Sequence, residues 1–501
     1  MAASAGALED AVKVDRGTFG RPTLKAYAVI TLAVAAMMTS ALSRPMMLHD
    51  SFWIDHVWAA QFTVLLGDGT LYPRWLPWSH DGLGSPVFYY YPPLAFYVTG
   101  LFGLAGLSTY GSILAAFALA FLVSGIGAYQ WLLGRSRFPL LGALFFALGP
   151  YHWYDFYMRG ALAESIAIAL LPLLALGLRR VAEGRSWIFA AVAYAAMIAS
   201  HLPLALLASL FFIVPYALLH RRRLAGFAKC CSVGIGLAAI YLLPAIALEP
   251  YRDGAQLWAM PHLRPTYWSI FVADWSNFFV RHTYITIATL LVPALIVAFG
   301  TRDRWAFYAL GILALAAGII PFVWSLPLLR DVQFPYRVLP LAELAIATAI
   351  ARAPISPILR VAAIGLPLAW AVVVTQLAGG LSPNRGEAIR RHIDVAEYMP
   401  PGVQQEDRRV PWLDEPRAGR IPPPAVEGWI VRPTFYFPAW SCGQPEPRTK
   451  LLMHRPSCTP RLELTAYEKI GGLISLLSLL IIIAQSVVMR TRRGKPSTAS
   501  G

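Results

Sequence analysis

The chain has 501 residues, of which 57% are hydrophobic and only 14% are charged, and its net charge at pH 7 is +15. This composition excludes an ordinary soluble protein, which needs more charged residues to cover its surface. The lysines and arginines stand in short clusters between apolar blocks, an arrangement typical of membrane topology and of contact with anionic lipids. We therefore predict a polytopic membrane protein with no nucleic-acid partner.

The apolar blocks approach the ~20 residues that a helix needs to cross about 30 Å of hydrocarbon. Residues 1–23 have no signal-peptide pattern, so they are expected to form a cytoplasmic tail before an uncleaved signal-anchor. The predicted spans are 24–43, 111–133, 138–150, 162–179, 187–200, 202–219, 226–247, 283–300, 305–325, 338–351, 359–379 and 470–489. The predicted fold class is an all-α membrane protein with about 12 transmembrane helices and a small, partly β region near the C-terminus.

The basic clusters test this count of spans, because cytoplasmic loops are enriched in Lys and Arg. Twelve spans place every cluster on one side and both termini in the cytoplasm. The clusters are Lys13/Arg16/Arg21/Lys25, Arg135/Arg137, Arg179/Arg180/Arg185, Arg221/Arg222/Arg223, Arg302/Arg304, Arg352/Arg360 and Arg490/Arg492/Arg493/Lys495. If the short apolar stretch 94–107 also crossed, the clusters would fall on opposite sides. We therefore predict that 94–107 is a helix lying on the outer leaflet.

Two large segments are expected outside the membrane. The first is the loop 44–110, which lies within a transmembrane domain that covers 24–379. The second is a periplasmic domain at 380–469, followed by the last span, 470–489, and a cytoplasmic tail, 490–501. This domain is rich in Pro and Gly and contains WIVRPTFYFPAW, a pattern typical of strands. Cys442 and Cys458 both fall in it, and an oxidising compartment permits a disulfide between them.

The first outer loop places acids, His, Arg and many aromatic residues next to the membrane. Asp50 and Asp55 closely follow the first span, where an unpaired carboxylate is costly and commonly functional. The alternative is that each acid is solvated or paired with Arg44 or Arg74, and the chemistry alone leaves both interpretations open.

The order of motifs in this loop resembles that of the GT-C superfamily of membrane glycosyltransferases. Asp55 is followed by Gly69, by LYPRW at 71–75 and by YPPL at 91–94, with Tyr91 where relatives often have His. Later motifs are similar to those of a bacterial subgroup that includes YfhO-like proteins and proteins related to 6-pyruvoyl-tetrahydropterin synthase. These motifs are MRGALAE at 158–164, ASHLPLALL at 199–207, YLLPAIALE at 241–249 and DVQFPYR at 331–337.

The resemblance implies an inverting enzyme that moves a sugar from a polyprenyl-phosphate donor to a lipid or glycan acceptor. It places the reaction at the periplasmic face of a bacterial inner membrane, with a first-loop Asp as general base. The spacing to Gly69 favours Asp55 for this role, and Asp50 stays a second candidate. The leaving phosphate asks for Arg, Lys or a divalent cation such as Mg²⁺ or Mn²⁺. Asp55 and Asp155 are the candidate ligands for such an ion.

Further polar residues stand at the outer ends of the spans. Those predicted to bind the donor phosphate are Arg337, Arg159 and Arg74. Those predicted to bind substrate are His56, Tyr91, Asp155, Glu164, His201, Glu249 and Gln333. Purely structural alternatives stay open: Arg159 and Glu164 could pair with each other, and Arg337 could reach lipid headgroups.

Two other classes of function also remain open, a non-catalytic scaffold for envelope assembly and a transporter of lipid or glycan. Transport would need polar residues inside the spans near the bilayer midplane. The predicted spans are nearly free of charge, which favours chemistry at the outer face. The sequence has no Walker loop, GxGxxG or HExxH, which fits a lipid-linked donor rather than a nucleotide sugar.

Overall fold

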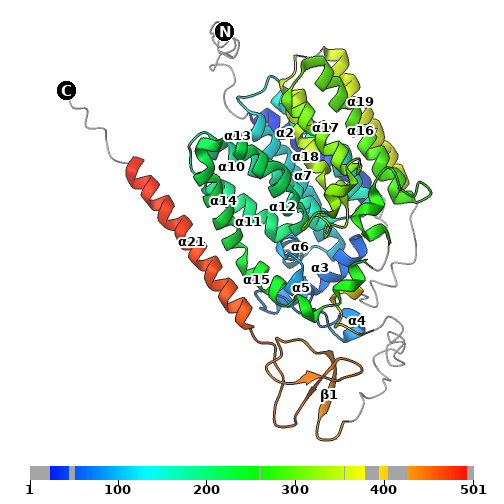
Figure 1. Cartoon of the computed structure of the whole chain (residues 1–501), viewed down its shortest axis with the longest axis vertical. Coiled ribbons are helices and arrows are strands. Elements are labelled where there is room, and N and C mark those ends of the chain that lie inside the picture. The colour runs from blue at the N-terminus through cyan, green and yellow to red at the C-terminus, as the bar shows by residue number, and fades with distance from the viewer. Residues whose placement is uncertain are drawn as a thin grey trace, which may run out of the picture.

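The computed structural model describes residues 23–43, 51–258, 261–354, 356–378, 394–403 and 426–493. The predictions for Asp50 and for most of both terminal tails lie outside these residues. Within them the chain is mostly helical, with a small β region towards the C-terminus, as predicted. Figure 1 shows the helices side by side in one bundle, the β region at one end and the helix α21 along the flank.

The helices of the first half are α2 (Leu24–Ser43), α3 (Phe52–Gly67), α4 (Ser79–Gly82), α5 (Val87–Tyr90), α6 (Leu94–Leu104), α7 (Thr109–Leu132), α8 (Pro139–Ala147), α9 (Pro150–Trp153), the π-helix η1 (Tyr154–Arg159), α10 (Leu162–Ala182), α11 (Ile188–Ser200), α12 (Leu202–Ala208), η2 (Ser209–Ile213) and α13 (Val214–Leu219). Those that follow are α14 (Leu224–Leu237), α15 (Ala239–Ala247), α16 (Phe278–Thr301), α17 (Arg304–Ala316), α18 (Leu339–Arg352), α19 (Pro357–Ala378) and α21 (Ala466–Arg493). Short 3₁₀ turns connect them, among them η4 (Glu249–Tyr251), η9 (Pro335–Val338) and η10 (Ala396–Tyr398).

Each predicted span overlaps a helix or a consecutive set of helices, because the apolar blocks were long enough to mark them. Among the described residues, five helices are long and apolar enough to cross a membrane, or six if the bent pair α14–α15 forms one span. The chain is therefore a membrane protein. Helices such as α8 and α18 are shorter than a full crossing, so the number twelve stays a prediction. The predicted helix at 94–107 is present as α6.

The centre of the bundle is α10, whose apolar stretch of 18 residues is 83% buried inside the protein. It packs along α7 on one side and α11 on the other. In contrast, the corresponding 18-residue apolar stretch of α21 is only 6% buried, and this helix contacts the bundle through α14 and α15. Large apolar side chains exposed along α21 are what a helix in lipid requires, since hydrocarbon replaces the protein core as its apolar solvent.

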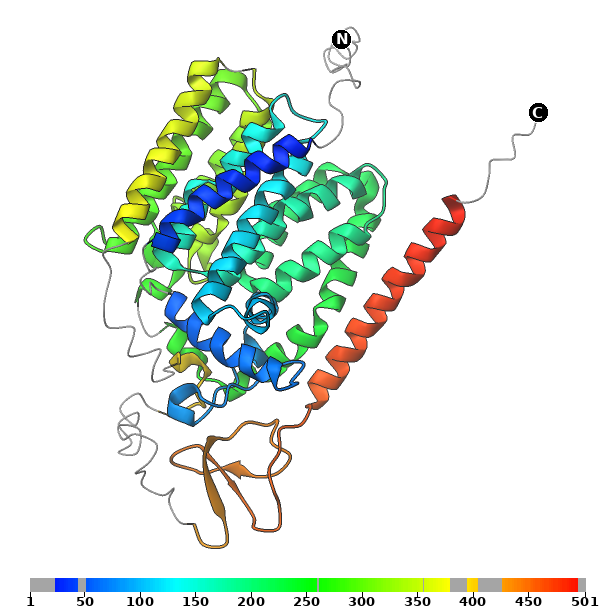
Figure 2. The same cartoon turned by 180° about the vertical axis from the view of Figure 1, so that it is seen from behind.

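The loops that carry the basic clusters meet at one end of the bundle. Arg135 pairs with Glu183 at 2.5 Å, and Arg352 pairs with Asp303 at 3.2 Å. The amide of Phe138 donates to the carbonyl of Ala351 at 2.9 Å, which joins these two sets of loops. The start of α2 and the end of α21 point to this same end (Figure 2). This arrangement fits the prediction that the basic clusters lie on one side of the membrane. That this side is the cytoplasmic one stays a prediction.

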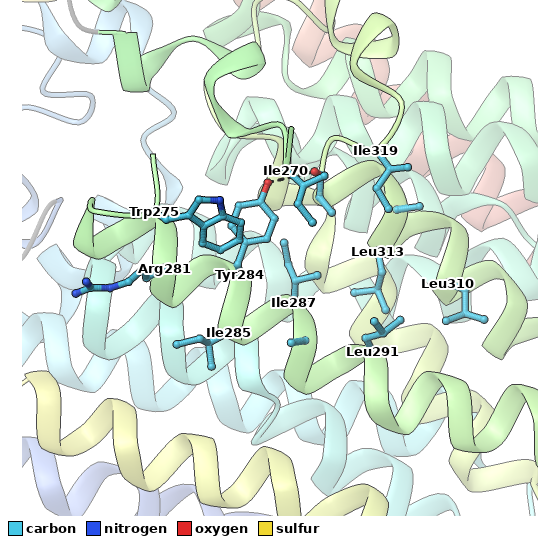
Figure 3. Close-up of a pocket in the computed structure, with 13 residues that line it drawn as sticks. Ile270, Trp275, Arg281, Tyr284, Ile285, Ile287, Leu291, Leu310, Leu313 and Ile319 are labelled. Carbon is cyan, nitrogen blue, oxygen red and sulfur yellow. Dashed lines mark hydrogen bonds between the residues drawn. The ribbon is translucent and has the colours of Figure 1, made fainter. Parts of the chain in front are cut away.

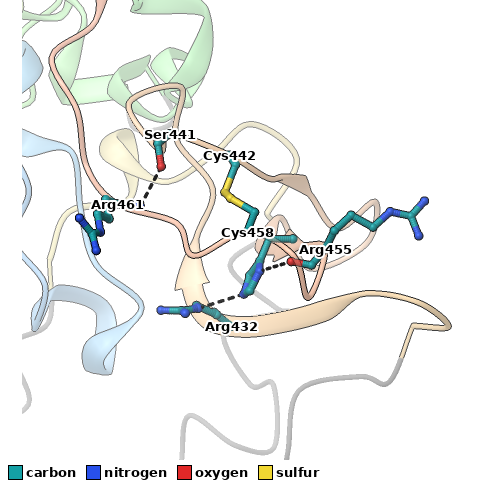
Figure 4. The surroundings of a disulfide bond; sticks show 7 residues. Arg432, Ser441, Cys442, Arg455, Cys458 and Arg461 are labelled. Atoms are coloured by element: carbon teal, nitrogen blue, oxygen red, sulfur yellow. Dashed lines mark hydrogen bonds between the residues drawn. A yellow bond between two sulfur atoms is a disulfide. The ribbon is translucent and has the colours of Figure 1, made fainter.

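The C-terminal β region contains β1 (Ile430–Phe435), β2 (Gln444–Pro445) and β3 (Leu451–His454) in the order β1-β3-β2, with antiparallel pairing. Strand β1 lies in the stretch that the sequence predicted to be extended. Figure 4 shows Cys442 and Cys458 joined in a disulfide beside these strands. The sheet is small, so the covalent link is expected to carry much of its stability.

We expect Cys442→Ser to destabilise this β region locally by about 3 kcal/mol, the chain-entropy value for a loop of about 15 residues. Hydrogen exchange on the intact chain in nanodiscs should show faster exchange at β1 and β3 and unchanged exchange in α10. Cys231→Ser, which alters a free and half-buried thiol, is the matched control. Equal protection of the strands in both variants would contradict this prediction.

Candidate active site

A cluster of buried ionisable side chains lies at the end of the bundle opposite the basic loops. It is built by η1, the first turn of α10, the junction of α11 and α12, and η9 just before α18. Helix α10 links the two ends: Glu164 lies in its first turn, and Arg179 and Arg180 lie in its last. At 1.5 Å per residue, its length separates the cluster from the basic loops by about 30 Å.

Arg159 is the cation at the centre of this cluster and is 1% exposed. Its Nη1 atom donates to Asp155 Oδ1 and to Glu164 Oε2, both at 2.7 Å. The other oxygen of Asp155 accepts a hydrogen bond from the Ser165 hydroxyl at 2.8 Å. Two carboxylates around one guanidinium make this a buried ion triad, whose members depend on one another for charge compensation.

The chain can reach this geometry because η1 ends at Gly160, which has a left-handed backbone with φ +62°. A Cβ atom there would lie 2.6 Å from the Cβ of Phe52 in α3. Glycine therefore allows α3 to approach the turn between η1 and α10. The Ser51 amide also donates to the Arg159 carbonyl at 3.0 Å, which fixes the start of α3 against the cluster.

Glu164 is the carboxylate that collects the most partners. Its Oε1 accepts from the Tyr151 hydroxyl at 2.6 Å, and its Oε2 lies 3.1 Å from Arg337 Nε and 3.8 Å from His201 Nε2. His201 accepts from the Leu204 amide through Nδ1, so its proton is on Nε2, towards Glu164. Burial lowers the pKa of His201 to about 3, so the ring is neutral at physiological pH.

Arg337 differs from Arg159 in how much of its hydrogen-bonding capacity is used. Its Nε atom donates to Glu164, and its side chain is 11% exposed. Among the hydrogen bonds of the described residues, the Arg337 side chain makes only this one, through Nε. A guanidinium held at one edge with a free fork of donors suits the oxygens of a phosphate.

Asp55 lies at the edge of the same cluster, in the first turn of α3, and is 2% exposed. Its Oδ2 accepts a hydrogen bond from the Leu162 amide at 3.2 Å, at the N-terminus of α10. The amides and dipole of that long helix favour the charged form of the carboxylate. A carboxylate at this position could accept a proton from a substrate hydroxyl.

Tyr91 is a buried tyrosine that packs on the helix carrying Asp55. Burial raises the pKa of Tyr91 well above its usual value, and the charges that act on it include Asp55, Arg337 and Glu164. Its ring packs edge-on against Trp58 on α3, with the centroids 4.8 Å apart. Tyr91 is therefore a neutral phenol at physiological pH, within electrostatic range of Asp55 and Arg337.

Four other predicted residues lie apart from this cluster or at its margin. Arg74 pairs with Glu468 of α21 at 2.8 Å and donates to the Ile240 carbonyl, so it ties the first loop to the last helix. Glu249 is 55% exposed and lies 3.8 Å from Arg252. His56 is half-buried next to Asp55 on α3, and Gln333 is half-buried in the loop before η9.

A second polar group inside the bundle was missed by the sequence reasoning. Glu343 of α18 is fully buried, and its Oε1 accepts a hydrogen bond from the Tyr151 amide at 2.5 Å. The ring of His152 lies between two partners: its Nδ1 is 2.8 Å from Glu343 Oε2, and its Nε2 is 2.9 Å from the Ser124 hydroxyl. A Cβ at Gly149 would lie 2.5 Å from Glu343, so this glycine permits the approach. Glu343 thereby caps the helix that carries Tyr151, Asp155 and Arg159.

An apolar pocket of about 700 Å³ opens between α16 and α17 (Figure 3). Exposed apolar residues such as Ile285 and Leu291 line it, as expected of a surface in contact with lipid chains. The hydroxyl of Tyr284 in its wall donates to the Trp268 carbonyl at 2.6 Å, and the Trp268 ring packs against Tyr336 at 4.8 Å. Tyr336 precedes Arg337, so a chain of contacting side chains runs from the pocket wall towards the polar cluster.

The described residues offer no ready set of ligands for a divalent cation. No group of three or more His, Cys, Asp or Glu side chains among them is placed to hold a metal ion. Both oxygens of Asp155, one of the two candidate ligands, already have partners in Arg159 and Ser165. A Mg²⁺ or Mn²⁺ ion at Asp55 and Asp155 stays a prediction.

No protein-family model matches this chain, and no curated protein matches it either. Among solved structures, it is similar to the cryo-EM structure of arabinofuranosyltransferase AftD from Mycobacteria, with 16% identity over 72% of this chain and a TM-score of 0.42. A structure of a mutant of that protein gives 18% identity over 72% of this chain and a TM-score of 0.45. The match covers 27% and 29% of those two chains, so this chain spans less than a third of their length.

Proposed function

We propose that this chain is an inverting membrane glycosyltransferase that moves a sugar from a polyprenyl-phosphate donor to a lipid or glycan acceptor. The observation that carries the proposal concerns Arg337. Its Nε atom donates to Glu164, and this is the one side-chain hydrogen bond that Arg337 makes with the described residues. A buried carboxylate, Asp55, lies in the same neighbourhood. This pairing of a base with an anion-binding fork is what transfer from a phosphate-linked sugar needs.

The reaction would be a single displacement. Asp55 accepts the proton of the acceptor hydroxyl as the acceptor oxygen bonds to the anomeric carbon of the sugar. The bond from that carbon to the phosphate oxygen breaks with its electron pair, and the polyprenyl phosphate leaves with one more negative charge. Arg337 stabilises this charge, and Arg159 keeps Glu164 ionised so that Glu164 can hold Arg337 in place.

The polyprenyl chain of the donor would lie in the apolar pocket between α16 and α17. The pocket is lined almost entirely by apolar side chains, and Tyr284 and Trp268 connect its wall to Tyr336 beside the phosphate site. This placement lets the lipid stay in the bilayer while its headgroup reaches Arg337. With the basic loops in the cytoplasm, the site would face the periplasm of a bacterial inner membrane.

Transport of a lipid or glycan is the second candidate, because Glu343 and His152 place ionisable groups inside the bundle. Polar residues at that depth are what a translocation path would require. However, Glu343 is occupied as the cap of the helix before η1, and Ser124 satisfies the far nitrogen of His152. These contacts favour a structural role for the pair over a transport role.

The test is a transfer assay on the purified chain in nanodiscs, with radiolabelled polyprenyl-phosphate sugars and a membrane lipid extract, with and without Mg²⁺ or Mn²⁺. Wild type should move label to a new product, and Arg337→Gln should lower that rate by about 10²- to 10³-fold, as the loss of one oxyanion donor does. Arg330→Gln, at an exposed residue of the same loop, is the control. No transfer from any donor by folded wild type would contradict the proposal.

A further inference from the structure

The C-terminal region places a short segment, 394–403, against the helix that carries Asp55. Trp58 of α3 donates through Nε1 to Asp394 Oδ1 at 2.8 Å, and the Asp253 amide donates to the Met399 carbonyl at 2.9 Å. The ring of Tyr398 stacks on Tyr90 with the centroids 6.0 Å apart. These contacts hold the segment against α3, α5 and the loop at Asp253, although more than 300 residues separate it from α3 in the sequence.

Asp394 contains an oxygen whose partner is missing. The side chain is 3% exposed, and its Oδ1 accepts from Trp58 and from the Val395 amide at 2.7 Å. Its Oδ2 is buried and accepts no hydrogen bond from any part of the chain that the structure describes. A buried carboxylate oxygen without a donor is costly, and native structures rarely keep one without a ligand or water to satisfy it.

We propose that Asp394, with Glu397 beside it, forms a subsite for the hydroxyl groups of the donor sugar. The inference rests on the proposed function and adds to it where the sugar is recognised. A single free carboxylate oxygen matches one hydroxyl donor, and the described residues around it provide no set of ligands for a metal ion.

The surroundings of Asp394 suit a sugar ring better than a small ion. Trp58 packs against Tyr91 at 4.8 Å and against Tyr398 at 5.9 Å, which leaves aromatic side chains around the carboxylate. A few polar groups set among aromatic rings are the usual composition of a small-molecule site, in which the polar groups fix orientation. The apolar face of a pyranose or furanose ring packs on such side chains while its hydroxyls meet the acids.

The subsite lies beside the expected position of the donor phosphate. Asp55 and Trp58 are three residues apart on α3 and so share one face of that helix. Burial raises the pKa of Glu397, while its hydrogen bond with Tyr398 and the charges of Arg252 and Arg337 oppose this shift. A sugar joined to a phosphate on Arg337 would therefore extend towards Asp394 and Glu397.

The test compares two kinds of probe in equilibrium binding to the full chain in nanodiscs. One is radiolabelled farnesyl phosphate, and the other is farnesyl phosphate that carries mannose, glucose, galactose or arabinofuranose. Wild type should bind at least one sugar-bearing probe about 10-fold more tightly than farnesyl phosphate, the effect of one hydrogen bond to a charged group. Asp394→Asn should remove this preference and leave the affinity for farnesyl phosphate unchanged. Glu427→Gln, at an exposed acid of the same region, should change neither.

Each other outcome decides against the inference in a distinguishable way. If wild type binds farnesyl phosphate but prefers no sugar-bearing probe, the subsite is wrong and the phosphate site stands. If wild type binds neither probe, the proposed function fails and the subsite fails with it. If Asp394→Asn binds neither kind of probe, the Glu397→Gln variant is measured next. Glu397→Gln should lose the preference for sugar-bearing probes and keep its affinity for farnesyl phosphate; any other result would overturn the subsite.

Discussion

Asp55→Asn is expected to lower the rate of sugar transfer by about 10²- to 10⁴-fold, the usual contribution of a general base. Asparagine keeps an oxygen that can accept from the Leu162 amide, so the contact between α3 and α10 should survive. The amide cannot take up a proton from the acceptor hydroxyl, and this is the property that the reaction needs. The measurement is the initial rate of label transfer with saturating donor.

A matched control for this variant is Asp68→Asn, at an exposed acid at the other end of α3. It should transfer sugar at the wild-type rate. An Asp55→Asn protein that folds and keeps more than about a tenth of the wild-type rate would not fit a base at this position. Loss of transfer in Asp50→Asn alone would instead move the base to Asp50.

Arg159→Met is expected to destabilise the folded chain by about 3–5 kcal/mol, the range for removing one partner of a buried ion pair. The substitution keeps much of the side-chain volume, so lost packing contributes little. Asp155 and Glu164 would then face each other without the cation that joins them at 2.7 Å on each side. Thermal unfolding in nanodiscs should show a clear decrease in the midpoint temperature.

A second substitution separates the charge effect from a general disturbance. Adding Asp155→Asn to Arg159→Met should restore part of the lost stability, because one of the uncompensated carboxylates is then neutral. Arg185→Met removes an arginine that is 71% exposed and lies 3.5 Å from Glu183, and should change stability little. If Arg159→Met unfolds at the wild-type temperature, the triad does not stabilise the fold.

The sequence predicted the helices well because each apolar block is a local signal. It also brought Arg159, Glu164, Arg337 and His201 forward as candidates, since each stands where an apolar block ends. It could not decide between an ion pair and a ligand site for Arg159 and Glu164. The structure contains both answers: Arg159 is enclosed by its two acids, and Arg337 keeps donors that no described residue uses.

The residues that the sequence reasoning missed depend on contacts between distant segments. Glu343 stands inside an apolar run, and its partner His152 belongs to another helix, so no local pattern joins the two. Asp394 and Trp58 are 336 residues apart in the sequence, so only the folded chain brings them together. The helix α3 had a local signal, since FWIDHVWAAQFTVLLG is mostly apolar, but its place inside a predicted loop concealed it.

The link between the first loop and the last helix also sets an order for biogenesis. Arg74 is buried and pairs with Glu468, and Trp58 donates a hydrogen bond to Asp394. Both residues are made early, so they lack these partners until the C-terminal region leaves the ribosome. A nascent chain halted after α19 would therefore lack the groups that bind Arg74 and Trp58 in the folded protein. These contacts between the first loop and the C-terminal region are therefore expected to be among the last to form.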